Sequence, residues 1–223
     1  MLALEVMEFR YIYNIHAMNE IGIDVVCLIL GYLIGSILFA HLITKIISGK
    51  NIRDLGNHNP GAYNVYAQVS KFWGVMSGIL DAVKAIVPML IANYFFEISN
   101  IALACLGIGA VIGHHYPLYY HFKGGRSAST LLGMFLYFIP IELGVAFVVD
   151  AILVFGFIRK RYAVWGPSIL IALSLVLCLF FHHPIEIKLM VWVGGLIVLW
   201  FNRDGLQNLF IKPGVKEKLS HQS

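Results

Sequence analysis

Charged residues are scarce in this chain of 223 amino acids: Asp, Glu, Lys and Arg make up 13% of it, against about 25% in an ordinary soluble domain. Hydrophobic residues make up 59%, where about 45–50% is usual. This imbalance excludes an ordinary soluble domain and indicates a membrane protein. Several apolar stretches reach the roughly 18–20 residues with which a helix crosses a ~30 Å hydrocarbon layer, so we expect a polytopic protein.

Cysteine is also rare, and its three positions exclude a disulfide framework. Cys27, Cys105 and Cys178 each lie inside an apolar run and are expected to be packing residues. The net charge of +4 does not indicate nucleic-acid binding, because the bases do not gather into one basic, aromatic-laced face. No His, Cys or carboxylate set has the spacing of a metal site. We therefore expect no metal, no cofactor and no nucleic-acid partner.

The apolar runs predict an all-α fold with about seven transmembrane helices. The fourth and fifth are short and are separated only by Pro140 and Glu142, so they form either two tilted short helices or a re-entrant pair. The expected spans cover residues 24–47, 72–96, 99–118, 127–141, 142–158, 163–182 and 187–201.

Lysine and arginine predict the orientation, because short loops rich in these residues stay in the cytoplasm. Arg10 and Lys188 are the only bases on one side of the predicted helices, so the N-terminus is expected outside and the C-terminus inside. Residues 1–23 then form an extracytoplasmic or interfacial segment, residues 24–201 the transmembrane domain and residues 202–223 a cytoplasmic tail. The bases on the other side are Lys50, Arg53, Lys71, Lys123, Arg126, Arg159, Lys160, Arg161, Arg203, Lys212, Lys216 and Lys218.

Polar residues gather in three segments on the predicted inner side. The first, residues 50–66, reads KNIRDLGNHNPGAYNVY and mixes asparagines with glycines, which lets the backbone turn with its amides exposed. The second, residues 122–130, reads FKGGRSAST: two cations flank a glycine turn that can form an anion nest, and hydroxyl residues then start a helix. The third, residues 202–204, follows the last span. The second segment is typical of a phosphate site, although it lacks the Walker A pattern.

Each segment also has a simpler interpretation. A basic glycine loop between spans is often only a turn with topology-setting charges, and Arg203 alone is typical of a membrane anchor. Within the second span, Asp81 and Lys84 lie three residues apart and therefore on one helix face. They form either an ion pair that orients the helix or part of the site. Asp150 is either protonated or a partner of Lys84, and glycines 109 and 113 predict close helix packing.

Five short motifs occur in a fixed order along most of the chain. Together they resemble those of the integral-membrane acyl-phosphate:glycerol-3-phosphate acyltransferases of bacteria, the PlsY type, over about residues 28–212. Each motif alone is weak, and the ordered set is specific. The motifs are Gly35-Ser36-Ile37, Arg53…Gly56…Asn59-Pro60-Gly61-Ala62…Asn64-Val65, Leu80-Asp81…Lys84, Gly113-His114…Pro117 and Phe122-Lys123-Gly124-Gly125…Thr130.

The resemblance implies seven helices around a site that opens to the inner leaflet of the bacterial cytoplasmic membrane. It implies transfer of a fatty acyl group from acyl phosphate to the 1-hydroxyl of glycerol 3-phosphate, or of a related polyol phosphate, without acyl-CoA, acyl carrier protein or metal. The implied catalytic residues are Ser36, Arg53, Asn59, Asn64, His114 and Lys123. The implied phosphate-binding residues are Arg53, Lys123, Gly124, Gly125, Arg126, Ser127, Thr130 and Arg203.

The chain departs from the family pattern at several of these positions. The family has threonine at Tyr63, lysine at Arg126 and glycine at Ser127, and it has His-Arg-Glu-Asn at residues 202–205, where this chain has Asn-Arg-Asp-Gly. The altered third motif leaves a second hypothesis open, a non-catalytic relative that binds lipid phosphates or regulates a partner. A transporter has less support, because the polar residues gather at one face and no paired broken helices occur in two halves.

Overall fold

The computed structural model describes residues 20–157 and 162–203, and every regular element within those ranges is helical. The expected all-α fold is thus confirmed for this part of the chain. The structure does not describe residues 1–19, 158–161 and 204–223. The predictions for the two terminal segments and for the bases at 159–161 therefore lie outside the described residues. The elements are a first helix over residues 20–35, α2 (Phe39–Ser48), η1 (Ile52–Asp54), α3 (Ala62–Gln68), α4 (Lys71–Phe96), α5 (Asn100–His115), η2 (Leu118–Tyr120), α6 (Ala128–Phe138), α7 (Pro140–Phe157), α8 (Tyr162–Phe180) and α9 (Ile185–Phe201).

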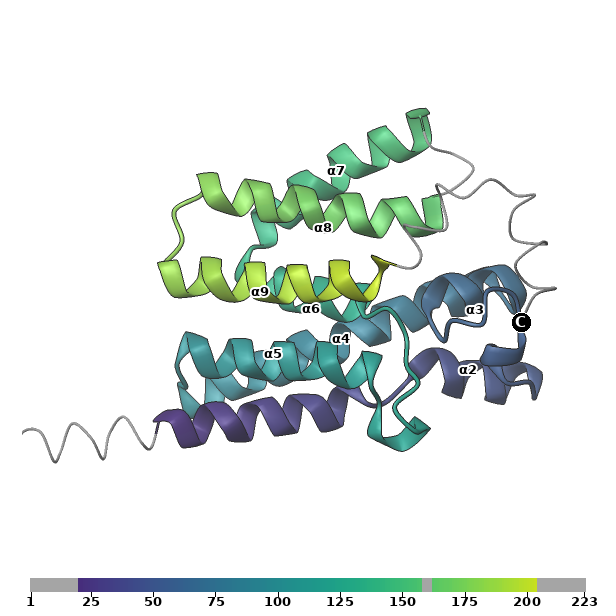
Figure 1. Cartoon of the computed structure of the whole chain (residues 1–223), viewed down its shortest axis with the longest axis horizontal. Coiled ribbons are helices and arrows are strands. Elements are labelled where there is room, and N and C mark those ends of the chain that lie inside the picture. The colour runs from purple at the N-terminus through teal and green to yellow at the C-terminus, as the bar shows by residue number, and fades with distance from the viewer. Residues whose placement is uncertain (1–19, 158–161, 204–223) are drawn as a thin grey trace, which may run out of the picture.

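The helices lie roughly side by side, as Figure 1 shows. The first helix, α4 and α5 form one side, α7 and α8 form the other, and α6 and α9 lie between them. Three helical stretches of the described chain are long and apolar enough to cross a membrane, namely Glu20–Ser48, Lys71–Phe96 and Asn100–Tyr120. The first includes a break in the helix, and shorter apolar helices occupy 128–138 and 166–180.

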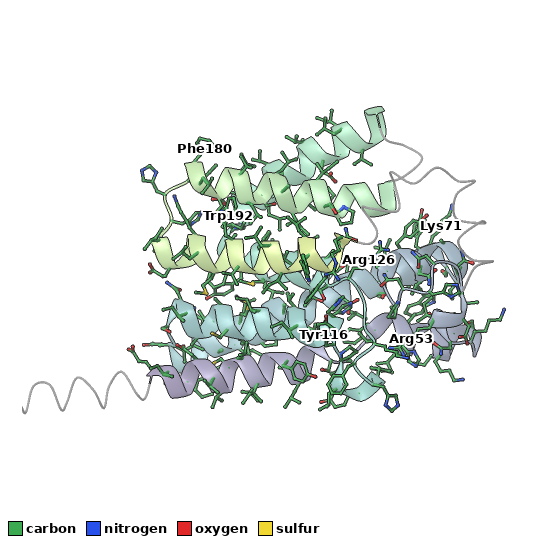
Figure 2. The ribbon with its side chains drawn as sticks, in the orientation of Figure 1. Arg53, Lys71, Tyr116, Arg126, Phe180 and Trp192 are labelled. Atoms are coloured by element: carbon green, nitrogen blue, oxygen red, sulfur yellow. The ribbon has the colours of Figure 1, made fainter. Side chains whose placement is uncertain are left out.

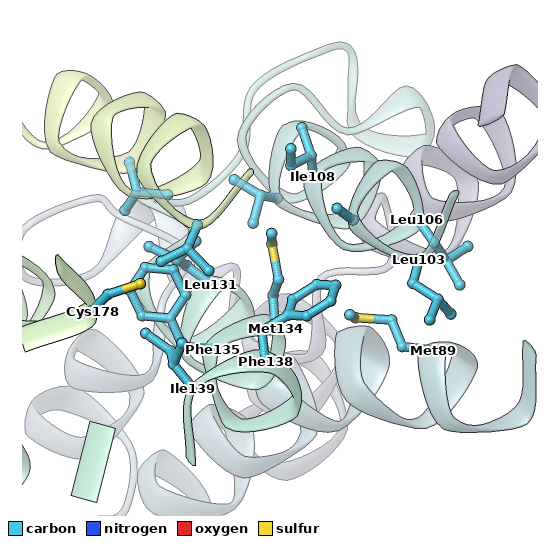
Figure 3. Packing of buried hydrophobic residues seen from close by; sticks show 14 of the residues in the cluster. Met89, Leu103, Leu106, Ile108, Leu131, Met134, Phe135, Phe138, Ile139 and Cys178 are labelled. Atoms are coloured by element: carbon cyan, nitrogen blue, oxygen red, sulfur yellow. The ribbon is translucent and has the colours of Figure 1, made fainter. Parts of the chain in front are cut away.

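Helix α6 supplies much of the buried core. Leu131, Met134 and Phe135 are fully buried between side chains of α4, α5 and α9, as seen in Figure 3. The helix has 11 residues, about half the length needed to cross a ~30 Å layer at ~1.5 Å per residue. It ends at Phe138, and α7 begins at Pro140, so the expected break at this proline is confirmed.

The first expected span, residues 24–47, is not one continuous helix. The backbone leaves the helix at residues 36–38 and resumes at α2. Two carbonyls at this break, of Gly35 and Ile37, accept hydrogen bonds from the Lys84 ammonium on α4 at 3.0 and 2.8 Å. The break therefore exists where a side chain from another helix supplies donors to carbonyls that lack helical partners.

Glycines bring the first helix and α5 into direct backbone contact. A methyl group added at Gly31 or Gly35 would lie within 3 Å of an α5 carbonyl oxygen. The same holds in reverse for Gly109 and Gly113, whose added methyl groups would meet carbonyls of the first helix. The close packing expected of the two α5 glycines is confirmed. This contact places the end of α5 against the helix break.

Candidate active site

A cavity of about 240 Å³ lies at one end of the helices, where α4, α5, α6, α8 and α9 meet the loop before α3. Its walls carry amides, hydroxyls and one arginine among apolar groups. In Figure 2, the labelled Arg126 lies at this end, on the same side of the molecule as Arg53 and Lys71. The cavity is lined by Asn57, Asn59, Gly61, Ala62, Tyr63, Asp81, His114, Arg126, Ser127, Ala128, Ser129, Pro167 and Asn202.

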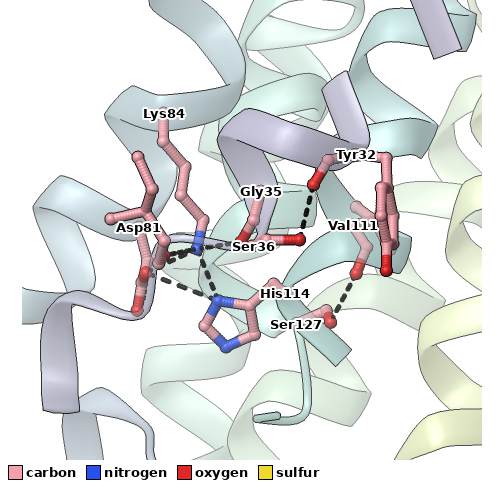
Figure 4. A network of polar contacts seen from close by, with 9 residues as sticks. Tyr32, Gly35, Ser36, Asp81, Lys84, Val111, His114 and Ser127 are labelled. Carbon is pink, nitrogen blue, oxygen red and sulfur yellow. Dashed lines mark hydrogen bonds and ion pairs between the residues drawn. The ribbon is translucent and has the colours of Figure 1, made fainter. Parts of the chain in front are cut away.

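A buried charge network forms one wall of the cavity (Figure 4). Lys84 Nζ lies 2.9 Å from Asp81 Oδ1, and the two side chains are only 3% and 2% exposed. The ammonium also lies 2.7 Å from His114 Nδ1, which is itself 3.4 Å from the same carboxylate oxygen. The predicted ion pair is confirmed, and it borders the cavity, because Asp81 and His114 are among the lining residues. A direct role of the pair in the site stays a prediction. Asp150 is not among the described partners of Lys84.

The contacts of the Lys84 ammonium determine what His114 can offer. An ammonium has hydrogens to donate and no lone pair, so Nδ1 of a neutral His114 ring acts as the acceptor. The ring hydrogen is then on Nε2. That nitrogen lies against Gly125, where an added methyl group would collide with it. His114 is thereby held as a hydrogen-bond donor beside the start of α6.

The segment before α6 is shaped by its contacts with the end of α5. A methyl group at Gly124 would meet the carbonyls of His114 and His115 within 3 Å. The Gly125 amide donates to the His114 carbonyl at 3.0 Å, and the Gly125 carbonyl accepts from His115 Nδ1 at 2.6 Å. The glycines are required for this close approach. Use of the Gly125 amide as a phosphate donor would require its present bond to open.

Ser127 turns the chain into α6 with a left-handed backbone at φ 60°. Glycine adopts this conformation without strain, whereas serine does not. The Ser127 hydroxyl donates to the Val111 carbonyl at 2.8 Å and is buried, which offsets part of the strain. The first residues of α6 then face the cavity, together with Arg126. Thr130, the last predicted phosphate ligand of this segment, is fully buried one turn further along.

Asn64 organises the loop that forms another wall. Its buried amide nitrogen lies 2.9–3.1 Å from the carbonyls of Ile52, Leu55 and Asn59, and its oxygen accepts from the Asn57 amide at 3.4 Å. These bonds fold the loop so that Asn57 and Asn59 line the cavity. Asn64 itself therefore positions other residues.

Ser36 is likewise engaged within the protein. Its buried hydroxyl donates to the Tyr32 carbonyl at 2.8 Å and accepts from the Leu118 amide at 3.1 Å. These bonds join the helix break to the turn after α5, as Figure 4 shows for the Tyr32 contact. Ser36 is not among the residues that line the cavity.

Three predicted cationic ligands are not among the residues that line the cavity. The Arg53 guanidinium donates to the Lys123 carbonyl and lies 5.7 Å above the Tyr120 ring. The Lys123 side chain is exposed. Arg203 is exposed at the end of α9, with its guanidinium 4.0 Å above the Trp200 ring. Arg126 is thus the cation among the described lining residues, and the phosphate roles of the other three stay predictions.

Several lining residues were not predicted as site residues. The sequence offers no local signal for Pro167, which lies within α8, or for a role of the asparagine at 202 beyond its place in the altered third motif. Asn57 and Ser129 lie in the first and second polar segments but were not among the predicted site residues. In the ranges that the structure describes, no three His, Cys, Asp or Glu side chains are grouped to hold a metal ion; the absence of a metal requirement stays a prediction.

Known proteins resemble this chain over most of its length. Residues 25–212 match the family model described as glycerol-3-phosphate acyltransferase. A glycerol-3-phosphate acyltransferase of Syntrophotalea carbinolica is 34% identical over 186 residues, which cover 82% of this chain and 92% of the relative. The enzyme of the same name from Aquifex aeolicus is 35% identical over 182 residues, with 81% and 92% covered.

Two solved structures have the same fold. A crystal structure of PlsY (YgiH), an integral membrane glycerol 3-phosphate acyltransferase in its glycerol 3-phosphate form, matches with a TM-score of 0.74 and 30% identity over 83% of this chain and 91% of that one. Its lysphosphatidic acid form matches with a TM-score of 0.73 and 29% identity. With its long apolar helices, this chain is a multi-pass membrane protein. The ordered motifs, the helical fold and these relatives agree, and the chain belongs to the glycerol-3-phosphate acyltransferase family.

Proposed function

We propose that this protein transfers a fatty acyl group from acyl phosphate to glycerol 3-phosphate and releases lysophosphatidate and inorganic phosphate. The single observation that carries the proposal is a cavity lined by Arg126, His114 and amides in a chain of this family. The PlsY structures named for their glycerol 3-phosphate and lysphosphatidic acid forms support the acceptor and the product. Acyl phosphate as the donor rests on the resemblance of the motifs.

The reaction needs positioning more than it needs a strong base. The 1-hydroxyl oxygen attacks the acyl carbonyl carbon, the bond from that carbon to the phosphate oxygen breaks, and the hydroxyl proton leaves with the phosphate as HPO₄²⁻. A mixed anhydride is already activated, so the protein chiefly brings two anions together and stabilises the developing oxyanion. In the proposal, the N–H group at Nε2 of His114 donates a hydrogen bond to that oxyanion.

The phosphate of one substrate is proposed to bind at Arg126 and the start of α6. Arg126 offers a planar fork of donors, Ser127 and Ser129 lie next to it, and the free amides of the helix start favour an anion. The carboxylate in the wall does not oppose this, because Asp81 is paired with Lys84. The cavity therefore presents net positive charge to its ligand.

The remaining predicted residues have proposed roles that follow from their contacts. Ser36 and Asn64 shape the walls, and Asn59 contacts substrate directly. Arg53 and Lys123 form a cationic surface beside the cavity, which attracts anionic substrates or lipid headgroups. Gly124, Gly125 and Thr130 are proposed to support the segment that carries Arg126, because they are packed against neighbouring groups. A phosphate contact of the exposed Arg203 stays a prediction.

We further propose seven spans, with the N-terminus outside and the C-terminus in the cytoplasm of a bacterial inner membrane. Residues 24–201 would form the acyltransferase domain, flanked by segments 1–23 and 202–223. Support comes from Lys71, Arg126 and Arg53, which lie toward one end of the molecule in Figure 2, whereas Phe180, at the end of α8, lies toward the other. Tagged termini tested for protease access in sealed vesicles would check the orientation.

The activity is tested with purified protein in lipid, labelled glycerol 3-phosphate and acyl phosphate, acyl-CoA or acyl carrier protein as alternative donors. Labelled lysophosphatidate should form with acyl phosphate. Arg126→Ala should raise the KM of the substrate whose phosphate it binds by about 10- to 150-fold, because a charge-assisted hydrogen bond contributes about 1.5–3 kcal/mol. Lys71→Ala, at the exposed start of α4, is the matched control and should behave like the wild type.

Two results would contradict the proposal. Binding of both phosphates without any ester product would favour a non-catalytic lipid-phosphate binder. Unchanged KM values for donor and acceptor in Arg126→Ala would show that neither substrate binds its phosphate at Arg126 in this cavity.

A further inference from the structure

Asn202 is the C-cap residue of α9 and has a side chain that the proposed reaction leaves unused. It is 5% exposed and lines the cavity. Its amide nitrogen donates to the Ser168 hydroxyl on α8 at 2.6 Å. Within the described part of the chain, its side-chain oxygen is buried without a hydrogen-bond partner. A buried acceptor of this kind favours a ligand that brings a donor.

The position of Asn202 is fixed from two sides. Its backbone amide donates to the Val198 carbonyl at 3.0 Å, which keeps it attached to α9. The preceding Phe201 ring stacks on His115 with centroids 3.6 Å apart and planes 5° apart, which attaches the end of α9 to the end of α5. With the amide nitrogen bonded to the Ser168 hydroxyl, the side-chain oxygen is the atom left without a partner among the described residues, in a residue that lines the cavity.

The chemistry of the two substrates selects the ligand. Acyl phosphate carries carbonyl and phosphate oxygens, which are acceptors, so it offers nothing to an amide oxygen. Glycerol 3-phosphate carries two hydroxyl donors. The reacting hydroxyl must give up its proton, and an amide oxygen is far too weak a base to take it. The hydroxyl that keeps its proton is the one an amide oxygen can hold throughout the reaction.

We propose that the side-chain oxygen of Asn202 binds the 2-hydroxyl of the acceptor and thereby makes Asn202, held by Ser168, a specificity-determining residue. This inference rests on the proposed function. It assigns a use to the asparagine that stands in the altered third motif. It also defines the acceptor class, a polyol phosphate with a hydroxyl next to the acylated carbon.

The test compares glycerol 3-phosphate with 3-hydroxypropyl phosphate, which keeps the phosphate and the reacting hydroxyl but lacks the 2-hydroxyl. We expect the wild type to prefer glycerol 3-phosphate by about tenfold or more in kcat/KM. Asn202→Leu should abolish that preference, chiefly by lowering kcat/KM for glycerol 3-phosphate. Asn202→Asp retains an acceptor oxygen and should retain the preference, although its negative charge lowers the affinity for both anionic substrates. Asn93→Leu, at the exposed far end of α4, is the matched control and should retain the wild-type ratio.

The outcomes separate this inference from the function beneath it. A wild-type protein that acylates neither compound overturns the proposed function and this inference with it. Acylation with no wild-type preference, or with a preference that Asn202→Leu leaves unchanged, overturns the inference alone. Should Asn202→Leu fail to fold, Ser168→Ala decides, because loss of the hydroxyl releases the carboxamide and should reduce the preference. An unchanged ratio in Ser168→Ala would then overturn the assignment.

Discussion

Replacing Lys84 with methionine removes the charge that neutralises Asp81 in the buried wall of the cavity. The substitution also leaves the Gly35 and Ile37 carbonyls without their donor. Removal of one partner of a buried ion pair typically lowers the free energy of unfolding by about 3–5 kcal/mol. For a chain of this size, about 1 kcal/mol corresponds to about 2–4 °C in Tm, so we expect a loss of about 6–20 °C. Thermal unfolding in detergent, followed by tryptophan fluorescence, measures it.

A double-mutant cycle tests the cause of this loss. Asp81→Leu combined with Lys84→Met removes both charges, so the double variant should lose less than the sum of the two single variants. Lys45→Met, on an exposed side chain of α2, is the control and should change stability by less than about 0.5 kcal/mol. Strict additivity, or a Lys84→Met protein as stable as the control, would refute the reasoning.

Substitutions at two further positions, Ser127 and Gly133, test the backbone geometry around the cavity. Ser127→Ala keeps the left-handed strain and loses the bond to the Val111 carbonyl, whereas Ser127→Gly relieves the strain. The free energy of unfolding of Ser127→Gly should therefore be about 1–2 kcal/mol higher than that of Ser127→Ala. Equal stabilities of the two variants would contradict the strain argument. Gly133→Ala places a methyl group against an α4 carbonyl and should lower the free energy of unfolding by about 1–3 kcal/mol. The control is Gly144→Ala, where nothing lies within 4 Å of the added methyl group. Similar Tm values for these two would show that α4 and α6 can separate freely.

The helices could be predicted from the sequence because long apolar runs permit few other structures in a membrane. The break after Gly35 could not, because the donor to its free carbonyls, the Lys84 ammonium, lies 49 residues further along the chain. Hydropathy describes each run alone. A hydrogen-bond donor on another helix does not change the hydropathy of the run that it interrupts, so the run alone does not predict the break.

The candidate site was predicted by segment more accurately than by residue. The glycine turn carries Lys123 and Arg126, which the sequence suggested as a pair around one phosphate. In the structure, Gly124 and Gly125 pack against the end of α5, and the two cations separate, with only Arg126 in the cavity wall. Residue types indicated that a phosphate site was plausible, but which side chain faces the cavity depends on contacts that involve another helix.

The distribution of the cavity wall along the chain has a consequence for redesign. Among the described residues, the helices after residue 161 supply Pro167 and Asn202 to the lining, whereas the arginine and the α6 start come from the earlier part of the chain. Under the proposed assignment, exchange of the last two helices between relatives would transfer the acceptor preference while the proposed phosphate-binding residues stay the same. New selectivities for short phosphorylated alcohols should be reachable by chimeras of this kind, without any change to Arg126 or the start of α6.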